Sequence, residues 1–131
     1  MLSICIVSAF FPPHLGGVEN YTKNLSMSLI KKGCNVTVLT SQIDKEPTIE
    51  QNNQMTIVRI PSFILLNNRF PVILPSRSSF ALYRMLSSFH FDAVIVNTRY
   101  YPLCLFGKKL AKNNSLKLIV IDHSSNYLFL D

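Results

Sequence analysis

The order of apolar and glycine-bearing stretches in residues 2–40 limits the fold more than any other feature of this sequence. Residues 2–7 are an apolar run typical of a strand, residues 9–17 hold two prolines and two glycines, and residues 18–33 have the pattern of a helix that ends at a glycine. A second run, rich in β-branched residues, follows at residues 35–40. A strand, a crossover helix and a second strand predict two parallel neighbours in one sheet.

The predicted helix is amphipathic. Apolar residues recur at helical spacing and indicate the face that packs on the sheet: Val18, Tyr21, Leu25 and Leu29. The opposite face is expected to carry polar residues: Glu19, Asn20, Lys23, Asn24 and Lys31. Two lysines fall in the last turn, where cations are favoured, and Gly33 supplies the C-terminal stop.

The rest of the chain continues the alternation of strands and helices. Three more strands are expected at residues 55–60, 93–96 and 116–121. One helix is expected from Ser76 or Ser78 to about Phe89, with inward residues Leu82, Met85, Leu86 and Phe89, and another from Tyr101-Pro102 to Asn113. Residues 41–54 and 61–75 are interpreted as loops. The second of these is apolar enough either to contact a membrane or to pack against its own domain.

These elements predict an α/β fold. It is a Rossmann-like, three-layer αβα sandwich with a mainly parallel sheet, whose strands, counted along the chain, lie in the order 3-2-1-4-5. The 131 residues are enough for a single domain, residues 1–131, with its own core. With 48% hydrophobic and 15% charged residues, the chain does not have a disordered composition.

Cysteine usage and the N-terminus indicate a compartment. The three cysteines are widely spaced in apolar surroundings, which favours buried free thiols in a reducing compartment over a disulfide framework or a zinc site. No apolar run approaches the ~18 residues of a membrane span. The first strand lacks the basic start and cleavage site of a signal peptide, so we expect a cytoplasmic protein.

The net charge of +6 is unevenly distributed. Nine basic residues lie between residues 59 and 117, and Asp92 is the single acid there. This asymmetry indicates an anionic partner, such as phosphates or a membrane surface, or else a solubilising face. No nucleic-acid-binding motif accompanies the charge, so nucleic acid is not expected as a partner.

Two predicted loops meet at the carboxyl edge of the sheet, residues 8–17 and 97–101, and the loop with His123 comes next. Open α/β sheets bind their ligands at this edge. Gly16 and Gly17 precede a helix N-terminus, whose free N–H groups suit an anion such as phosphate; the alternative is that they only form a tight turn. The third glycine of a dinucleotide fingerprint is missing, as is an acid after residue 40, so an NAD site is not expected.

Several motifs together resemble the N-terminal part of family 4 glycosyltransferases, retaining enzymes of the GT-B fold. The opening of the family is similar to Phe11-Pro12-Pro13, Gly16-Gly17-Val18-Glu19, Lys32-Gly33 and Asn35-Val-Thr-Val-Leu-Thr40. Later likenesses are Ile119-Val-Ile-Asp-His123, a strand ending in histidine, and Asn97-Thr-Arg-Tyr-Tyr-Pro102, similar to bacterial polysaccharide-building members. The resemblance covers nearly the whole chain. It implies an acceptor-side lobe whose donor, a UDP- or GDP-sugar, binds mainly to a second lobe.

The resemblance also implies roles for single residues. Gly16 and Gly17 would offer backbone N–H groups to the charge that develops on the leaving diphosphate. His123 would touch the transferred sugar or line the acceptor site, and it is the candidate catalytic residue. No metal and no cofactor are expected.

Three further residues are candidates for substrate contact because they lie near the same edge: His14, Glu19 and Arg99. His14 and Arg99 would face ligand, with a loop histidine and a solvated arginine as the alternatives. Glu19 can equally be explained as an acid in the first turn of a helix.

The chain departs from the family pattern. The donor-binding lobe is missing, and Ser124 follows the histidine where many members have glycine. The leading hypothesis is therefore the acceptor-side domain of a glycosyltransferase for a cell-surface polysaccharide or lipid-linked acceptor, inactive alone and in peripheral contact with the inner face of the membrane. The alternatives are a non-catalytic subunit of a split GT-B enzyme, held to a separate donor-lobe polypeptide, and another nucleotide-binding Rossmann-like module.

Overall fold

The computed structural model has ten regular elements. Its strands are β1 (Ser3–Ser8), β2 (Asn35–Gln42), β3 (Ile49–Asn52), β4 (Met55–Leu65), β5 (Phe70–Ile73), β6 (Ala93–Asn97) and β7 (Lys117–Ile121), and its helices are α1 (Gly17–Lys31), α2 (Arg77–Ser87) and α3 (Pro102–Asn113). The structure describes residues 2–9, 11, 17–43, 45–52, 54–65, 70–73, 76–97 and 102–121.

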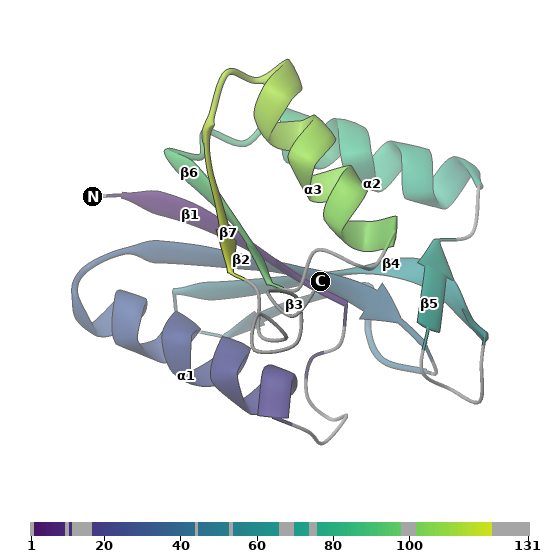
Figure 1. Ribbon diagram of the computed structural model, residues 1–131, viewed down its shortest axis with the longest axis horizontal. Coiled ribbons are helices and arrows are strands. Elements are labelled where there is room, and N and C mark those ends of the chain that lie inside the picture. The colour runs from purple at the N-terminus through teal and green to yellow at the C-terminus, as the bar shows by residue number, and fades with distance from the viewer. Residues whose placement is uncertain are drawn as a thin grey trace, which may run out of the picture.

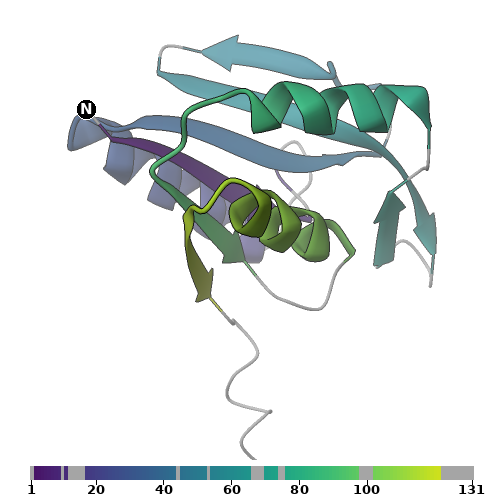
Figure 2. The same ribbon diagram turned by 90° about the horizontal axis from the view of Figure 1, so that it is seen from above.

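The sheet has the predicted order. Its strands run β3-β4-β2-β1-β6-β7, with β5 paired to β4. The five strands β4, β2, β1, β6 and β7 are mutually parallel, which confirms the predicted order 3-2-1-4-5. Helix α1 covers one face of the sheet, and α2 and α3 cover the other (Figures 1 and 2). The Rossmann-like three-layer α/β fold is therefore confirmed.

Two core clusters follow from the alternation of side chains along the strands. On β1, Cys5 and Val7 pack with α2 and α3, whereas Ile4 and Ile6 belong to the cluster beneath α1. Both clusters are almost fully buried around the central strands. This double burial explains why the central strands read as continuous apolar runs in the sequence.

The buried face of α1 differs from the predicted one. Tyr21 was expected to face the sheet, but its side chain is 40% exposed. Thr22 and Ser26 are fully buried instead, and Glu19, expected on the solvent side, is 9% exposed. The physical reason is that the N-terminal half of α1 lies over Ser8 and Asn97 of the sheet, and the Thr22 hydroxyl forms hydrogen bonds with both.

Both predicted loops contain strands, so these two interpretations were wrong. In residues 41–54, β2 continues to Gln42 and β3 forms an antiparallel hairpin with β4. In residues 61–75, β4 continues to Leu65 and pairs with β5. Pro61 does not end β4, because the strand changes its partner from β2 to β5 there, and a proline is tolerated where no ladder N–H is needed.

Local rules located most helix ends correctly. Ser76 caps α2, and its hydroxyl accepts a hydrogen bond from the Ser79 backbone N–H at 3.2 Å. Gly33, with φ +93°, ends α1, as predicted. On α2, Leu82 and Leu86 are buried as expected; Met85 is half-buried, and Phe89, beyond the helix end, is 37% exposed rather than inward.

Candidate functional site at the carboxyl edge of the sheet

The candidate site lies where β1 and β6 end side by side. The chain leaves β1 toward α1 on one face and leaves β6 toward α3 on the other. This divergence is the topological switch point at which open α/β sheets bind ligands. Helix α1 begins here at Gly17, so its free backbone N–H groups are at the same edge.

Four polar side chains form a continuous row across this edge on the face covered by α1. We call Arg59, Thr40, Ser8 and Asn97 the polar row, in their order across β4, β2, β1 and β6. Each follows by two residues an apolar side chain of the cluster beneath α1: Ile57, Val38, Ile6 and Ile95. The register pairs Thr40 with Arg59 and Ser8 with Asn97. All four are buried, with exposures of 4% or less.

Thr22 of α1 joins the helix to the row. The Asn97 side-chain amide donates to the Thr22 hydroxyl at 2.6 Å, and that hydroxyl donates to the Ser8 hydroxyl at 3.2 Å. One turn later, the Ser26 hydroxyl donates to the Thr22 carbonyl at 2.8 Å. The ends of two strands and the first half of α1 are thus fixed by buried hydrogen bonds, which positions the helix N-terminus over the switch point.

The other two members of the row differ in how they are satisfied. The Arg59 guanidinium donates to the Pro47 carbonyl at 3.0 Å and to the Glu50 carboxylate at 2.9 Å. The Thr40 hydroxyl is buried and has no hydrogen-bond partner among the described residues. An unsatisfied hydroxyl in the interior is unfavourable, so Thr40 is an unusual residue for a position that only needs to be packed.

A groove opens beside the row between α1 and the β3–β4 edge. It has a volume of about 360 Å³ and an apolar floor that includes Met27, Ile30 and Ile57. Lys23 and the buried guanidinium of Arg59 also line it. The row and the groove therefore share Arg59.

Of the residues predicted from sequence, the structure describes two. Gly17 is the first residue of α1, and Glu19 lies in its first turn on the buried side, one turn before Thr22. The other four, His14, Gly16, Arg99 and His123, lie outside the described residues. Their roles, and that of Glu19 in substrate binding, stay predictions.

Thr22 and Thr40 were not predicted as parts of this edge, whereas Asn97 belongs to the segment 97–101 that was placed there. A signal for Thr40 was present: β2 alternates Val36, Val38 and then Thr40 on one face, so the apolar series is broken at the last position before the edge. The hydrogen bond between Asn97 and Thr22 cannot be predicted from the sequence pattern, because the two residues are 75 positions apart.

The cysteines are structural. All three thiols are free and buried, and burial raises the pKa of the Cys5 thiol to about 12, so it is protonated at neutral pH. No group of three or more histidine, cysteine, aspartate or glutamate side chains that could hold a metal occurs in the described part of the chain. Among those same residues, no helix is both long and apolar enough to cross a membrane.

Comparison with known proteins supplies a family and similar folds. A protein-family model described as Glycosyltransferase Family 4 matches residues 15–130. A structure of sucrose-phosphate synthase from Thermosynechococcus elongatus is similar with a TM-score of 0.65 at 17% identity, over 94% of this chain and 33% of that one. A second structure of the synthase from the same organism has a TM-score of 0.55 at 16% identity, over 98% of this chain and 67% of that one. The chain thus spans about a third of the first synthase chain. No curated protein matches significantly.

Proposed function

The chain belongs to glycosyltransferase family 4, with the fold of a GT-B N-terminal lobe, and from that premise we propose that it is the acceptor-side lobe of a retaining glycosyltransferase. The donor would be a nucleotide-sugar, a UDP- or GDP-sugar. The acceptor would be a glycan or a lipid-linked precursor of a cell-surface polysaccharide, reached from the cytoplasmic side of the membrane.

The observation that carries this proposal is the fixed geometry at the switch point. Hydrogen bonds from Thr22 to the ends of β1 and β6 hold the first half of α1 in place. Transfer of a sugar from a nucleotide leaves a diphosphate, whose charge increases as the bond to the sugar breaks. Backbone N–H groups at Gly16 and Gly17 would stabilise this charge. At Gly17, the first residue of α1, the helix N-terminus supplies such a group without reorganisation during the reaction.

The remaining residues have roles that suit their chemistry. His123 would contact the transferred sugar, and His14, Glu19 and Arg99 would bind substrate around the same edge. The groove between α1 and the β3–β4 edge suits an acceptor with both apolar and polar parts, because its floor is apolar and Lys23 and Arg59 border it. No metal or cofactor has a role in this proposal.

A substitution at the glycine loop tests the proposal. The protein as its native cell produces it is compared with its Gly17→Leu variant for transfer of sugar from radiolabelled UDP- and GDP-sugars to a membrane extract. Transfer is expected to be lost while the far-UV circular dichroism is unchanged, because a side chain at this position would occupy the space of the diphosphate. Ser28→Leu, at an exposed position in the second half of α1, is the matched control and is expected to retain transfer. Full activity in Gly17→Leu would refute the diphosphate role.

A second candidate is favoured by the surface of β7. Leu118, Ile119 and Val120 are each 40–42% exposed on β7, which is the last strand in the described order of the sheet, whereas the central strands β1, β2 and β6 are mostly buried. We propose as the alternative a subunit of a split GT-B enzyme, in which a separate donor-lobe polypeptide covers this edge. The intact mass of the native protein decides between them. A mass well above 14.9 kDa supports a single two-lobed enzyme, and a mass equal to it supports the split enzyme.

A further inference from the structure

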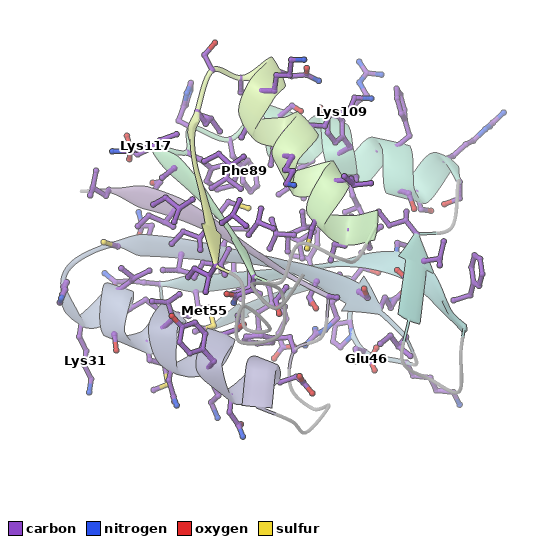
Figure 3. The ribbon with its side chains drawn as sticks, in the orientation of Figure 1. Lys31, Glu46, Met55, Phe89, Lys109 and Lys117 are labelled. Carbon is purple, nitrogen blue, oxygen red and sulfur yellow. The ribbon has the colours of Figure 1, made fainter. Side chains whose placement is uncertain are left out.

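Helices α2 and α3 carry a surface that the proposed transfer reaction does not use. Together they contain five cations and no acid, namely Arg77, Arg84, Lys108, Lys109 and Lys112. Both lie on the face of the sheet opposite α1 (Figures 1 and 2). In Figure 3, Lys109 is on this side of the molecule and Lys31 is on the α1 side.

Each helix presents the same pattern to solvent. On α2, Phe80 lies between Arg77 and Arg84 at helical spacing, and all three are exposed. On α3, Leu105, Lys109 and Lys112 are exposed at the spacing i, i+4, i+7. Phe80 and Leu105 are the most exposed large apolar side chains among the described residues, at 63% each. A face that served only for solubility would not place exposed apolar side chains beside its cations.

An open groove between the two helices extends this surface. It has a volume of about 660 Å³, with Phe80, Tyr83 and Phe106 among its lining residues. The rings of Tyr83 and Phe106 meet edge to face with centroids 4.9 Å apart, and the Lys109 ammonium lies 5.8 Å from the centroid of the Tyr83 ring. Arg84 approaches the Phe80 ring in the same way, at 5.8 Å. Cations and aromatic rings are therefore interleaved around this groove.

We propose that the outer face of α2 and α3 binds an anionic membrane surface. The cations would contact lipid phosphates, while Phe80 and Leu105 enter the boundary between headgroups and acyl chains. Nucleic acid is the weaker choice, because no nucleic-acid-binding motif accompanies these cations, and Leu105 adds an exposed aliphatic side chain that suits acyl chains better than bases. This inference deepens the proposed function, since it names the surface by which the lobe would reach a lipid-linked acceptor.

The chain contains no tryptophan, which permits a direct test. Phe80→Trp introduces a single fluorescent reporter on the proposed surface. Tyr21→Trp places the matched reporter on α1, at a side chain that is 40% exposed. On addition of phosphatidylcholine vesicles that contain phosphatidylglycerol, the emission of Phe80→Trp is expected to shift to the blue and that of Tyr21→Trp to stay unchanged. Equal shifts in both variants, or no shift in Phe80→Trp, would overturn the proposal.

Charge reversals test the electrostatic part by vesicle co-sedimentation. Arg77→Glu with Lys109→Glu is expected to weaken binding at least about 20-fold, since each cation near an anionic surface contributes roughly fivefold. The matched control, Lys32→Glu with Lys45→Glu, changes the net charge equally at exposed positions away from α2 and α3. Equal losses in the two variants would mean that net charge alone attracts the chain, which overturns the assignment of a surface.

Two further outcomes have a definite meaning. Retention of the wild-type chain on an RNA column, with no sedimentation on vesicles, would assign the surface to nucleic acid and refute the membrane. These assays need no nucleotide-sugar, so a failure here is distinguishable from a failure of sugar transfer. Far-UV circular dichroism of every variant confirms that the exposed substitutions leave the fold intact.

Discussion

Replacing Thr22 by valine removes one buried hydroxyl from the centre of the site and leaves the side-chain volume almost unchanged. In the native structure this oxygen accepts from the Asn97 amide at 2.6 Å and donates to the Ser8 hydroxyl at 3.2 Å. Threonine and valine have similar helix propensities, so α1 itself is little affected. The change therefore isolates the two hydrogen bonds.

The expected cost follows from the burial of both partners. Ser8 and Asn97 are 0% exposed, so water cannot replace the lost hydroxyl. An amide hydrogen that loses its acceptor in the interior costs about 1–3 kcal/mol, and the bond to Ser8 adds about 1 kcal/mol. We expect Thr22→Val to lower the free energy of unfolding by about 2–4 kcal/mol.

Thr40→Val is the matched control, because it makes the same chemical change in the same polar row. The Thr40 hydroxyl is buried without a hydrogen-bond partner among the described residues, so its removal is expected to leave stability unchanged or to raise it by about 1 kcal/mol. Urea unfolding followed by far-UV circular dichroism measures both variants, with equal m-values as the condition for comparing them. Equal losses in Thr22→Val and Thr40→Val would refute the reasoning, because they would show that the hydrogen bonds contribute nothing specific.

Three more predictions concern packing, a helix end and the thiols. Gly107→Ala is expected to destabilise the fold by about 1–3 kcal/mol, because a Cβ there would lie 2.7 Å from a methyl group of Val7. This clash outweighs the better helix propensity of alanine. Thermal unfolding measures the effect, and an unchanged melting temperature would contradict the close packing of α3 on β1. Ser115 follows α3 with φ +56°, in the left-handed region that favours glycine, so Ser115→Gly is expected to stabilise the folded state by about 1 kcal/mol. A loss of stability in urea unfolding would show that the Ser115 hydroxyl contributes more than the relief of backbone strain. Thiol titration at pH 8 is expected to find no fast-reacting cysteine in the native chain and three after denaturation, because all are buried and the pKa of Cys5 is raised to about 12; rapid reaction of the native chain would contradict this.

The order of the sheet was predictable because local rules and topology agree in this chain. The apolar strands are short and separated by clear helix signals, so the right-handed crossover rule leaves few arrangements. Gly33 and Ser76 marked helix ends through backbone geometry and capping, both of which act over a few neighbouring residues. These two helix ends were therefore confirmed, whereas the buried face of α1 depends on the sheet beneath it and was predicted wrongly at Tyr21.

The two hairpins were missed because their strands are recognised by their partners. β3 consists of Ile49, Glu50, Gln51 and Asn52, and every side chain is exposed, so it has no apolar alternation to read. What orders it is pairing with β4 and the contact of Glu50 with the buried guanidinium of Arg59. A sequence pattern cannot show that an arginine in one predicted strand needs an acid from a predicted loop.

The excess of basic residues could be counted in the sequence, but their positions in space could not be predicted from it. Counting cations predicted an anionic partner, yet the count mixes two kinds of residue. Arg59 is 4% exposed and forms a salt bridge with Glu50, whereas Arg77 and Lys109 are exposed beside an aromatic groove. Only the arrangement of α2 and α3 separates a structural cation from one that a partner can reach.

Among the four residues of the polar row, Thr40 is the one whose hydroxyl has no hydrogen-bond partner among the described residues. Val36 and Val38 show that β2 accommodates valine beneath α1, and a third valine at Thr40 would remove an unsatisfied buried hydroxyl. Selection for stability alone favours that replacement, so threonine at this position is a local exception that packing does not account for. Such exceptions are expected where function imposes its own demands, and this one lies in the row beside the switch point, on the face where α1 begins. The same reasoning makes Thr40 a position at which stability and sugar transfer should respond in opposite directions to replacement by valine.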